Sequence, residues 1–333
     1  MKKESFLFVA VFAAWVSGSA SCAVAAQAAA PRLTVVATTF PHYDWTRRVL
    51  GDQTNRVQLV LLQRNGVDLH SYQPTVSDLR LISACDLFIY LGGESDKWVD
   101  AALAQGMNPG RRTLCLLQTL GDAAKEEQLV EGMEAEHDHD HKHEKHEEKD
   151  EKPELDEHVW LSLRFAARLC AAIARELSVV DPAGAETYHR NAEKYRAELA
   201  ALDREYADAV AHAVRKTVLV ADRFPFRYLM DDYGLSYFAA FAGCSAESEA
   251  SFKTVVFLAK KVDELGLPVI LTLEGTQHRI AETVRRTTKT RNQKILPIDS
   301  LQSVTEETAK YSSYLDVMRR NLDTLRVAIG SGM

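Results

Sequence analysis

Short runs of apolar, often β-branched residues alternate with segments of helical periodicity along most of this chain. In the first half, the apolar runs predict four strands, at residues 33–38, 57–62, 86–91 and 113–117. Helical patterns lie between them, at residues 42–50, 74–84 and 94–105. Because strands that are apolar along nearly their whole length must be covered on both faces, this alternation predicts a parallel sheet between helices.

The second half of the chain repeats the scheme. Four strands are predicted at 217–221, 236–241, 268–273 and 294–298, and four helices at 225–232, 251–265, 277–289 and 305–328. The 333 residues suffice for two cores, since single cores stop growing at roughly 250–300 residues. We therefore predict the α/β class, with two Rossmann-like lobes that each contain a mostly parallel four-stranded sheet.

One long helical pattern, from about Ala183 to Ala213, separates the two halves. Apolar residues recur along it at steps of four and three and form a single stripe, made of Tyr188, Ala192, Tyr195, Leu199, Leu202, Tyr206, Ala209 and Ala213. At 1.5 Å per residue this helix spans roughly 45 Å, so we predict a rigid helix that joins the lobes. The alternative is the seam of a coiled-coil dimer. The expected domains are 31–180, 181–213 and 214–333.

The N-terminus has the order of a secretory signal peptide, which we predict at residues 1–28. Two lysines precede an apolar segment at 6–16, and small residues with Ala-x-Ala triplets follow it. Lipidation of Cys22 is the alternative to cleavage after one of these triplets. No other apolar run approaches the roughly 20 residues that a membrane span requires. We expect an exported protein, in the periplasm or at the cell surface.

A histidine-rich acidic tract at residues 131–155 is too polar to bury a core, and it predicts a disordered, solvated loop. Five of the eleven histidines of the chain lie in it: His137, His139, His141, His143 and His146. Neutral imidazole is well suited to borderline divalent metals such as zinc. We predict weak, exchangeable accessory metal sites in this tract; a charged loop without a role is the alternative.

Charge and cysteine spacing exclude several classes of function. Residues 131–157 contain thirteen acidic and four basic residues, a net charge of −9, so the chain total of −7 leaves +2 for the remainder. No basic patch therefore argues for nucleic acid. The cysteines beyond the signal peptide, Cys85, Cys115, Cys170 and Cys244, form no Cys-x-x-Cys pair, which disfavours a cysteine-based structural zinc site. Their apolar sequence contexts favour inert buried thiols. The sequence does not select disulfide partners among them.

Four isolated ligand candidates stand at or after predicted strand ends, where open α/β sheets place their ligand sites. They are His70, His158, His278 and Asp222. Each has an ordinary alternative, since a lone loop histidine is commonly a surface residue, and Asp222 suits the cap of the next helix. Taken together, three imidazoles with one carboxylate or water make a four-coordinate site that favours zinc over manganese. We predict that these residues meet in a cleft between the lobes.

Two motifs now carry a family resemblance. The segments Asp68-Leu-His70-Ser-Tyr72-Gln-Pro74 and Asp156-Glu-His158-Val-Trp160-Leu match the Asp-x-His-Ser-Tyr-x-Pro and Asp-x-His-x-Trp-Leu signatures of metal-specific solute-binding proteins of bacterial ABC importers. The chain resembles that zinc and manganese family over essentially its whole mature length. The resemblance implies that both histidines are metal ligands, and that a histidine-rich acidic loop before the second is typical of zinc-specific members.

The second lobe departs from the family pattern. Many members place a third histidine, or a glutamate in manganese binders, where counting back from Tyr233-Gly-Leu235 finds Arg223 in this chain. Arginine carries no acceptor and is no ligand. His278 stands where manganese binders supply an aspartate. The expected ligands are therefore His70, His158 and His278, with Asp222, Glu247, Glu274 or water as the open choices for the fourth.

The resemblance implies a monomeric extracytoplasmic protein that captures Zn²⁺ and delivers it to an ABC permease, without catalysis. Manganese or iron transport is the main alternative. A surface adhesin is compatible with the same fold, because fold does not determine function. A secreted zinc hydrolase is disfavoured, since the sequence contains no His-Glu-x-x-His motif.

Overall fold

The computed structural model describes residues 32–133, 154–245 and 249–332. The predicted signal peptide, the five histidines of the acidic tract and Glu247 lie outside the described residues. Contacts between residues group 32–333 into one compact unit, which contains two separate sheets. The domain boundaries predicted at residues 180 and 213 fall inside this unit and stay a prediction.

The first sheet is parallel throughout, with the strand order β2-β1-β3-β4. Its strands are β1 (Leu33–Ala37), β2 (Val57–Leu61), β3 (Leu87–Tyr90) and β4 (Arg112–Cys115). Helices α1 (Phe40–Leu50) and α5 (Leu163–Val180) contact one face, whereas α2 (Val76–Ala84) and α3 (Trp98–Ala104) cover the other. Burial on both faces explains why the central strands β1 and β3 are apolar along nearly their whole length, whereas the edge strands β2 and β4 contain exposed polar residues.

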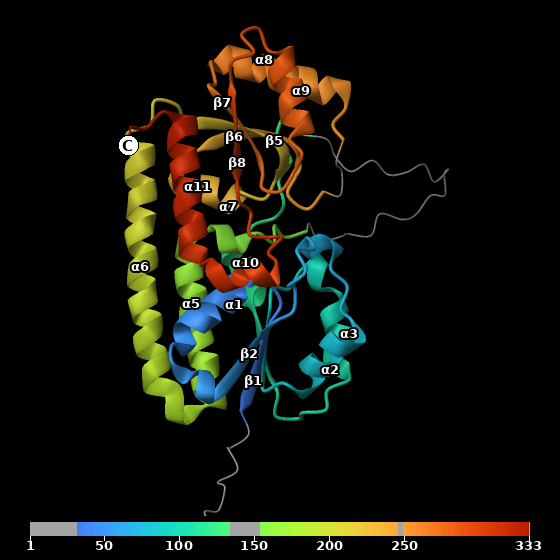
Figure 1. The fold of residues 1–333 in the computed structure, drawn as a ribbon, viewed down its shortest axis with the longest axis vertical. Coiled ribbons are helices and arrows are strands. Elements are labelled where there is room, and N and C mark those ends of the chain that lie inside the picture. Colours follow the sequence, from blue (N-terminus) through green and yellow to red (C-terminus); the bar gives the residue numbers. More distant parts are fainter. Residues whose placement is uncertain (1–31, 134–153, 246–248, 333) are drawn as a thin grey trace, which may run out of the picture. The chain divides into compact units, whose positions relative to one another are not determined.

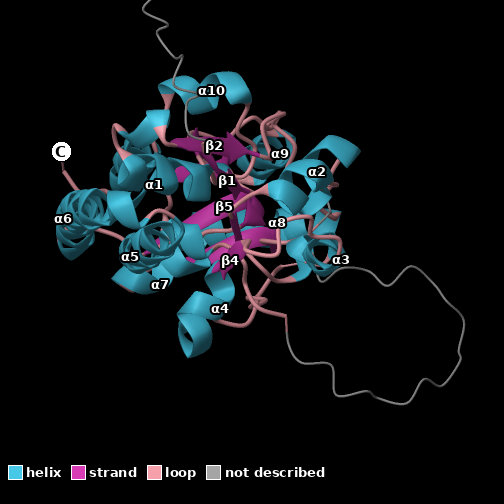
Figure 2. Ribbon diagram, turned by 90° about the horizontal axis from the view of Figure 1, so that it is seen from below, coloured by secondary structure: helices cyan, strands magenta, loops and turns pink. Residues whose placement is uncertain are grey.

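The second sheet is also parallel and has the order β6-β5-β7-β8. Its strands are β5 (Thr217–Phe224), β6 (Ser236–Ala242), β7 (Val269–Leu273) and β8 (Lys294–Ile298). Helices α8 (Phe252–Leu265) and α9 (Arg279–Thr287) cover one face, and α11 (Tyr314–Ile329) packs on the other. The short helix α7 (Arg227–Tyr233) connects β5 to β6. Figure 2 shows helices on both sides of the strands. The predicted fold class is confirmed.

The long helix α6 (Ala185–Ala211) contacts both lobes. It packs against α1 and α5 of the first lobe and against α7 and α11 of the second, and Figure 1 shows it running beside α5 and α11. Of the predicted stripe, the seven residues from Tyr188 to Ala209 are buried and Ala213 is partly buried. No helix in the described ranges is long and apolar enough to cross a membrane.

A single apolar core runs through both lobes. It includes Val35 and Leu87 of the first sheet, Val220 and Leu271 of the second, and the buried stripe of α6. Each sheet has a further core of its own under its outer helices. Because the lobes share one core, separating them would expose apolar surface, so their mutual position is held by burial.

Polar contacts tie the two lobes together at the edge of this core. The backbone N–H of Tyr314, at the start of α11, donates to Asp44 of α1 at 2.9 Å. The Tyr314 hydroxyl donates to the backbone oxygen of Trp160 at 2.6 Å, and its ring packs edge-on against Trp45. These contacts are fully buried. They fix the relative orientation of two lobes that the shared apolar core already holds together.

The element boundaries differ from the predictions at three places. The helix predicted at 305–328 is two helices, α10 (Glu306–Tyr311) and α11, because Ser313 caps the second by accepting from the backbone N–H of Asp316. Residues Leu116–Leu120, partly predicted as strand, form the short helix α4. The strand β5 does not end at Asp222, because it continues past an irregularity in register to Phe224.

One buried histidine near the first sheet is stabilised in its neutral form. His42 of α1 is 0 % exposed, its Nδ1 contacts Thr38 Oγ1 at 3.3 Å, and its Nε2 finds no hydrogen-bond partner among the described residues. Burial lowers the pKa of His42 to about 3.

This shift predicts acid sensitivity of the fold. Between the unfolded pKa of about 6.5 and the folded pKa of about 3, the unfolded chain binds a proton that the folded chain does not, so stability falls as the pH falls through this window. For the metal-free protein, His42 should contribute a loss of about 2 kcal/mol in the free energy of unfolding between pH 7 and pH 5. Urea unfolding of His42→Leu across this range should show a correspondingly smaller slope. The control His212→Gln, on an exposed side chain, should keep the wild-type slope; an unchanged slope for His42→Leu would contradict the assignment.

Candidate metal centre

His70 is held in a short turn that follows strand β2. The turn, Leu69–Ser71, is capped by Asp68, whose Oδ1 accepts the backbone N–H of His70 at 3.0 Å. On the imidazole, Nδ1 lies 2.8 Å from Ser95 Oγ. The Ser95 hydroxyl donates its hydrogen to Glu157, so it can only accept from His70. The Nδ1 of His70 therefore carries the proton, and Nε2 has a free lone pair.

His158 is oriented in the same way by another carboxylate. Its imidazole is 0 % exposed, and Nδ1 lies 2.8 Å from Asp156 Oδ1, which also accepts the backbone N–H of His158. A carboxylate accepts only, so Nδ1 is the protonated nitrogen and Nε2 again has the lone pair. The ring of Trp160 packs edge-on against this imidazole, with centroids 5.3 Å apart. Carboxylate-oriented histidines of this kind are typical of metal ligands.

The two lone pairs point to one place. The Nε2 atoms of His70 and His158 are 3.3 Å apart, and the side-chain nitrogen of Gln302 lies 3.1 Å from the first and 2.9 Å from the second. The two hydrogens of this amide suit two acceptors. Gln302 follows strand β8 and is buried. The second lobe thus supplies a hydrogen-bond donor to the same atoms that would bind a metal ion.

Electrostatics keep His70 neutral. Burial, followed by the neighbouring His158, lowers the pKa of His70 to about 3. The Glu157 carboxylate lies 3.7 Å from the Nδ1 of His70, and burial raises the pKa of this carboxyl. A neutral imidazole is the form that binds metal, so His70 is in its ligand state across the ordinary pH range.

Cys244 is the third potential ligand at this point. Ligand atoms of His70, His158 and Cys244 all lie within 4.8 Å of one another. Cys244 follows strand β6, and its neighbour Gly243 passes so close to His158 that an added Cβ would stand 2.7 Å from the imidazole Cε1. A glycine is therefore required for the chain to bring Cys244 to the pair.

The predicted ligands of the second lobe lie in the same cavity. A cavity of about 550 Å³ is lined by residues that include His70, Cys244, Asp222 and His278. His278 has a φ of 54° and Nδ1 contacts to Thr272 and Thr276 at 3.3 Å and 3.2 Å.

The hydroxyls around His278 settle which of its nitrogens is protonated. Thr272 donates to Asp222 and Thr276 donates to the backbone oxygen of Leu273, so the Nδ1 of His278 is the donor toward them. Its Nε2 has the lone pair, as in His70 and His158. His278 and Asp222 lie outside the tight cluster formed by His70, His158 and Cys244.

Arg223, which stands where the resemblance places a third histidine, has a structural contact instead. Its guanidinium donates to Asp68 Oδ2 at 2.8 Å and so connects the second lobe to the turn that carries His70. Burial alone would raise the pKa of Asp68, but the charge and hydrogen bond of Arg223 outweigh it and lower that pKa. Arg223 therefore positions His70 across the lobe junction.

Glu274, one of the open choices for a fourth ligand, faces another cavity. Its carboxylate accepts from the backbone N–H and the hydroxyl of Ser300, and it lines a cavity together with Asp299 and Tyr311. Burial and the charge of Asp299 raise the pKa of Glu274 to about 8. The Glu274 carboxylate is therefore hydrogen-bonded to Ser300 and does not line the cavity that contains His70.

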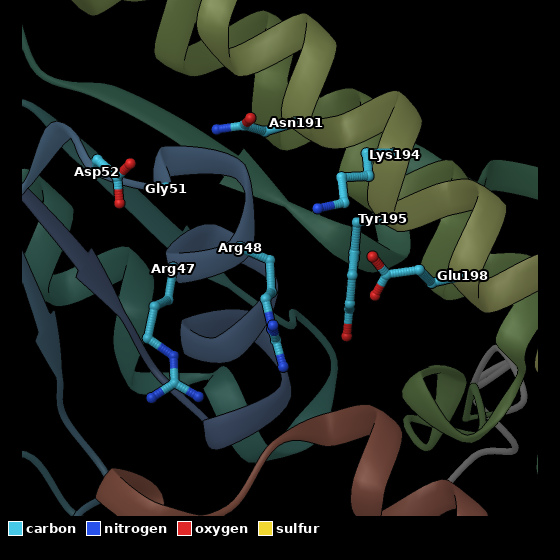
Figure 3. Close-up of a pocket in the computed structure, with 8 residues that line it drawn as sticks. All are labelled: Arg47, Arg48, Gly51, Asp52, Asn191, Lys194, Tyr195 and Glu198. Carbon is cyan, nitrogen blue, oxygen red and sulfur yellow. The ribbon is translucent and has the colours of Figure 1, made fainter.

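A third cavity, of about 450 Å³, lies between α1 and α6 (Figure 3). Arg47 and Arg48 enter it from α1, and Lys194 and Glu198 from α6. The Arg48 guanidinium lies over the ring of Tyr195, 5.7 Å from its centroid. The residues that line this cavity include no histidine or cysteine, and the charges of both signs give no preference for one ligand.

Two parallel-sheet lobes with imidazole and thiol groups converging at their junction define the class of two-lobed metal-binding proteins. The chain belongs to the family described as zinc-uptake complex component A, periplasmic, whose model matches residues 35–328. Known relatives include the zinc-binding lipoprotein AdcA of Streptococcus pneumoniae, 31% identical over 98% of this chain. The high-affinity zinc uptake system protein ZnuA of Bacillus subtilis is 30% identical, over 93% of this chain and 91% of its own length.

The fold agrees with a solved structure in this family. The Zn(II)-bound ZnuA-like domain of S. pneumoniae AdcA superposes with a TM-score of 0.68 at 28% identity, covering 90% of this chain and 99% of that domain. The chain spans only about three fifths of the length of the AdcA proteins, 61% for the relative named above. The predicted family resemblance is confirmed.

Sequence reasoning missed two residues of the centre, Cys244 and Gln302. Both follow strands of the second sheet, at the carboxyl ends where the other candidates stand, and this position was the available signal. The apolar sequence context of Cys244 predicts an inert buried thiol, but the side chain is only partly buried, and Gln302 is not a residue type that suggests a metal site. Within the described residues, all four cysteines are free thiols.

Proposed function

We propose that this protein captures Zn²⁺ outside the cytoplasmic membrane and delivers it to an ABC permease. The proposal rests on the convergence of the His70 and His158 lone pairs. Their Nε2 atoms are 3.3 Å apart, and each Nδ1 is hydrogen-bonded to a side-chain oxygen. Two imidazoles fixed in this tautomer are prepared to bind one ion without rearranging their protons. The names of the relatives, zinc-binding and zinc-uptake proteins, support the choice of metal.

The donor set favours zinc over manganese. We propose that His70, His158 and His278 supply three imidazole nitrogens and that an anionic group of the second lobe adds the fourth ligand, for which Asp222 is the residue predicted from the sequence. Zinc prefers four ligands with nitrogen and sulfur, whereas manganese prefers more oxygen atoms. Zinc is here the cargo, and we propose binding and release with no chemical turnover.

The partner and the location follow from the same proposal. A zinc carrier in this family acts as the extracytoplasmic component of an importer, so its partner is a permease in the cytoplasmic membrane. We propose that the predicted signal at 1–28 directs export, with retention by a lipid on Cys22 as the alternative. A monomer is expected, because α6 buries its stripe within the chain and offers no apolar seam to a second copy.

Metal titration of the stripped mature protein tests the site. We expect His70→Ala and His158→Ala each to lower the zinc affinity at least about 100-fold, since loss of a ligand should exceed the roughly 10–100-fold effect of an outer-shell partner. His278→Ala should weaken binding in the same direction. The control His189→Ala, on an exposed face of α6, should bind as the wild type does. Unchanged affinity in all three ligand variants would refute the proposal.

The carboxylate behind His158 allows a second test. Asp156→Asn keeps the size of the side chain but removes the charge that orients the imidazole, so zinc affinity should fall about 10-fold to 100-fold. The matched control is Asp122→Asn, an exposed aspartate of the same lobe. Competition with a chelator of known affinity measures both. Equal affinity of Asp156→Asn and wild type would show that this carboxylate does not orient the ligand.

The histidine tract is proposed to hold accessory zinc. Deletion of residues 134–151 should lower the number of zinc ions bound per chain and leave the tightest site unchanged, because closely spaced imidazoles bind weakly in many registers. Calorimetric titration separates the two classes of site. A second variant, with the five histidines replaced by asparagine, keeps the length of the tract and isolates the imidazoles. A large loss of the tightest affinity on deletion would mean that the tract supplies a primary ligand.

A further inference from the structure

We propose that the thiolate of Cys244, rather than the carboxylate of Asp222, is the anionic ligand of the zinc site. The proposal rests on the proposed function and specifies its chemistry. Its basis is geometric. The ligand atoms of His70, His158 and Cys244 all lie within 4.8 Å of one another in the described part of the chain. Asp222 lines the same cavity but stands outside this group.

The backbone of the second lobe brings Cys244 to this place. Strand β6 ends at Ala242, and Gly243 then passes against His158 at a distance that excludes any side chain. The backbone N–H of Cys244 donates to Glu127 Oε1 at 3.2 Å, which attaches this loop to the segment preceding the histidine tract. The close approach of Gly243 to His158 and the hydrogen bond to Glu127 therefore hold the backbone of Cys244 in place, and with it the thiol.

The other cysteines of the described chain serve as a contrast. Cys85 and Cys170 are completely buried within apolar cores, and Cys115 donates weakly to the backbone oxygen of Leu91. None of these three belongs to a group of ligand atoms of this kind. Cys244 alone among the described cysteines lines the cavity that contains His70 and His278.

Asp222 has a different task in this arrangement. Its Oδ2 accepts from the Thr272 hydroxyl, which in turn accepts from His278, and its Oδ1 accepts from the backbone N–H of Arg223. Asp222 therefore orients His278, as Asp156 orients His158. Gln302 offers only a neutral amide. The Glu157 carboxylate is engaged by the backbone N–H and the hydroxyl of Ser95. The Cys244 thiol is therefore the group left beside the two histidines to supply an anionic ligand.

Binding is balanced in atoms and charge. As Zn²⁺ enters, the S–H bond of Cys244 breaks heterolytically, the proton leaves to solvent, and the sulfur lone pair forms the Zn–S bond. The amide of Gln302 gives up its two hydrogen bonds, and the Nε2 lone pairs of His70 and His158 bind the ion. A site with one thiolate discriminates against manganese and magnesium more strongly than one with a carboxylate, because these ions prefer oxygen.

Cobalt and cadmium report the thiolate directly. The mature protein loaded with Co²⁺ or Cd²⁺ should show the ultraviolet thiolate-to-metal charge-transfer absorption, and Cys244→Ser should lose it. Cys115→Ser is the matched control and should retain it. Absorption that persists in Cys244→Ser, or that is absent from wild-type protein with bound cobalt, would overturn the proposal.

Affinity and selectivity give an independent readout. Cys244→Ala should lower zinc affinity at least about 10-fold and narrow the preference for zinc over manganese. Asp222→Asn should cost less zinc affinity than Cys244→Ala; the reverse order would contradict the assignment. Zinc should also slow alkylation of Cys244 in the wild-type chain, a measurement that requires no variant to fold.

The two proposals fail differently. If wild-type protein binds no zinc tightly, or if His70→Ala and His158→Ala bind as wild type does, the proposed function is wrong. If zinc binds tightly through both histidines but the charge-transfer absorption is absent, only the assignment of Cys244 is wrong.

Discussion

The apolar stripe of α6 holds the two lobes in one position, and the candidate metal centre depends on this. Residues from Tyr188 to Ala209 are buried against helices of both lobes, in a core that continues from the first sheet to the second. His70 and His158 come from the first half of the chain, whereas Cys244 comes from the second. Their ligand atoms can stay within 4.8 Å only because the lobes cannot separate without exposing the shared core.

Within that frame, hydrogen bonds decide which nitrogen of each histidine is available. Asp156 and Ser95 take the Nδ1 protons, so the Nε2 lone pairs of both rings face the same point. Two lone pairs at 3.3 Å repel each other, and the amide of Gln302 satisfies both of them. A metal ion at the proposed site would compete with this amide, because both imidazoles are already oriented by the groups at their Nδ1 atoms. The centre is thus prepared for binding before any ion arrives.

Local motifs made part of this centre predictable. The Asp-x-His pattern around His70 and His158 is short-range, because the aspartate caps or orients the histidine two residues later in the chain. Cys244 and Gln302 carry no such pattern, and each reaches the centre from a different strand of the second sheet. Arg223 shows the same limit, because only the fold reveals that it binds Asp68 across the lobe junction.

The sequence by itself determined the α/β class, the two sheets, the long helix and the histidines that local motifs present. These features follow from periodicity and from hydrogen bonds between near neighbours, which are properties of short segments. Only the tertiary structure decided which distant side chains complete the candidate centre and how β5 continues past Asp222. Those outcomes depend on packing between elements far apart in the chain, and no pattern of single residues records that packing.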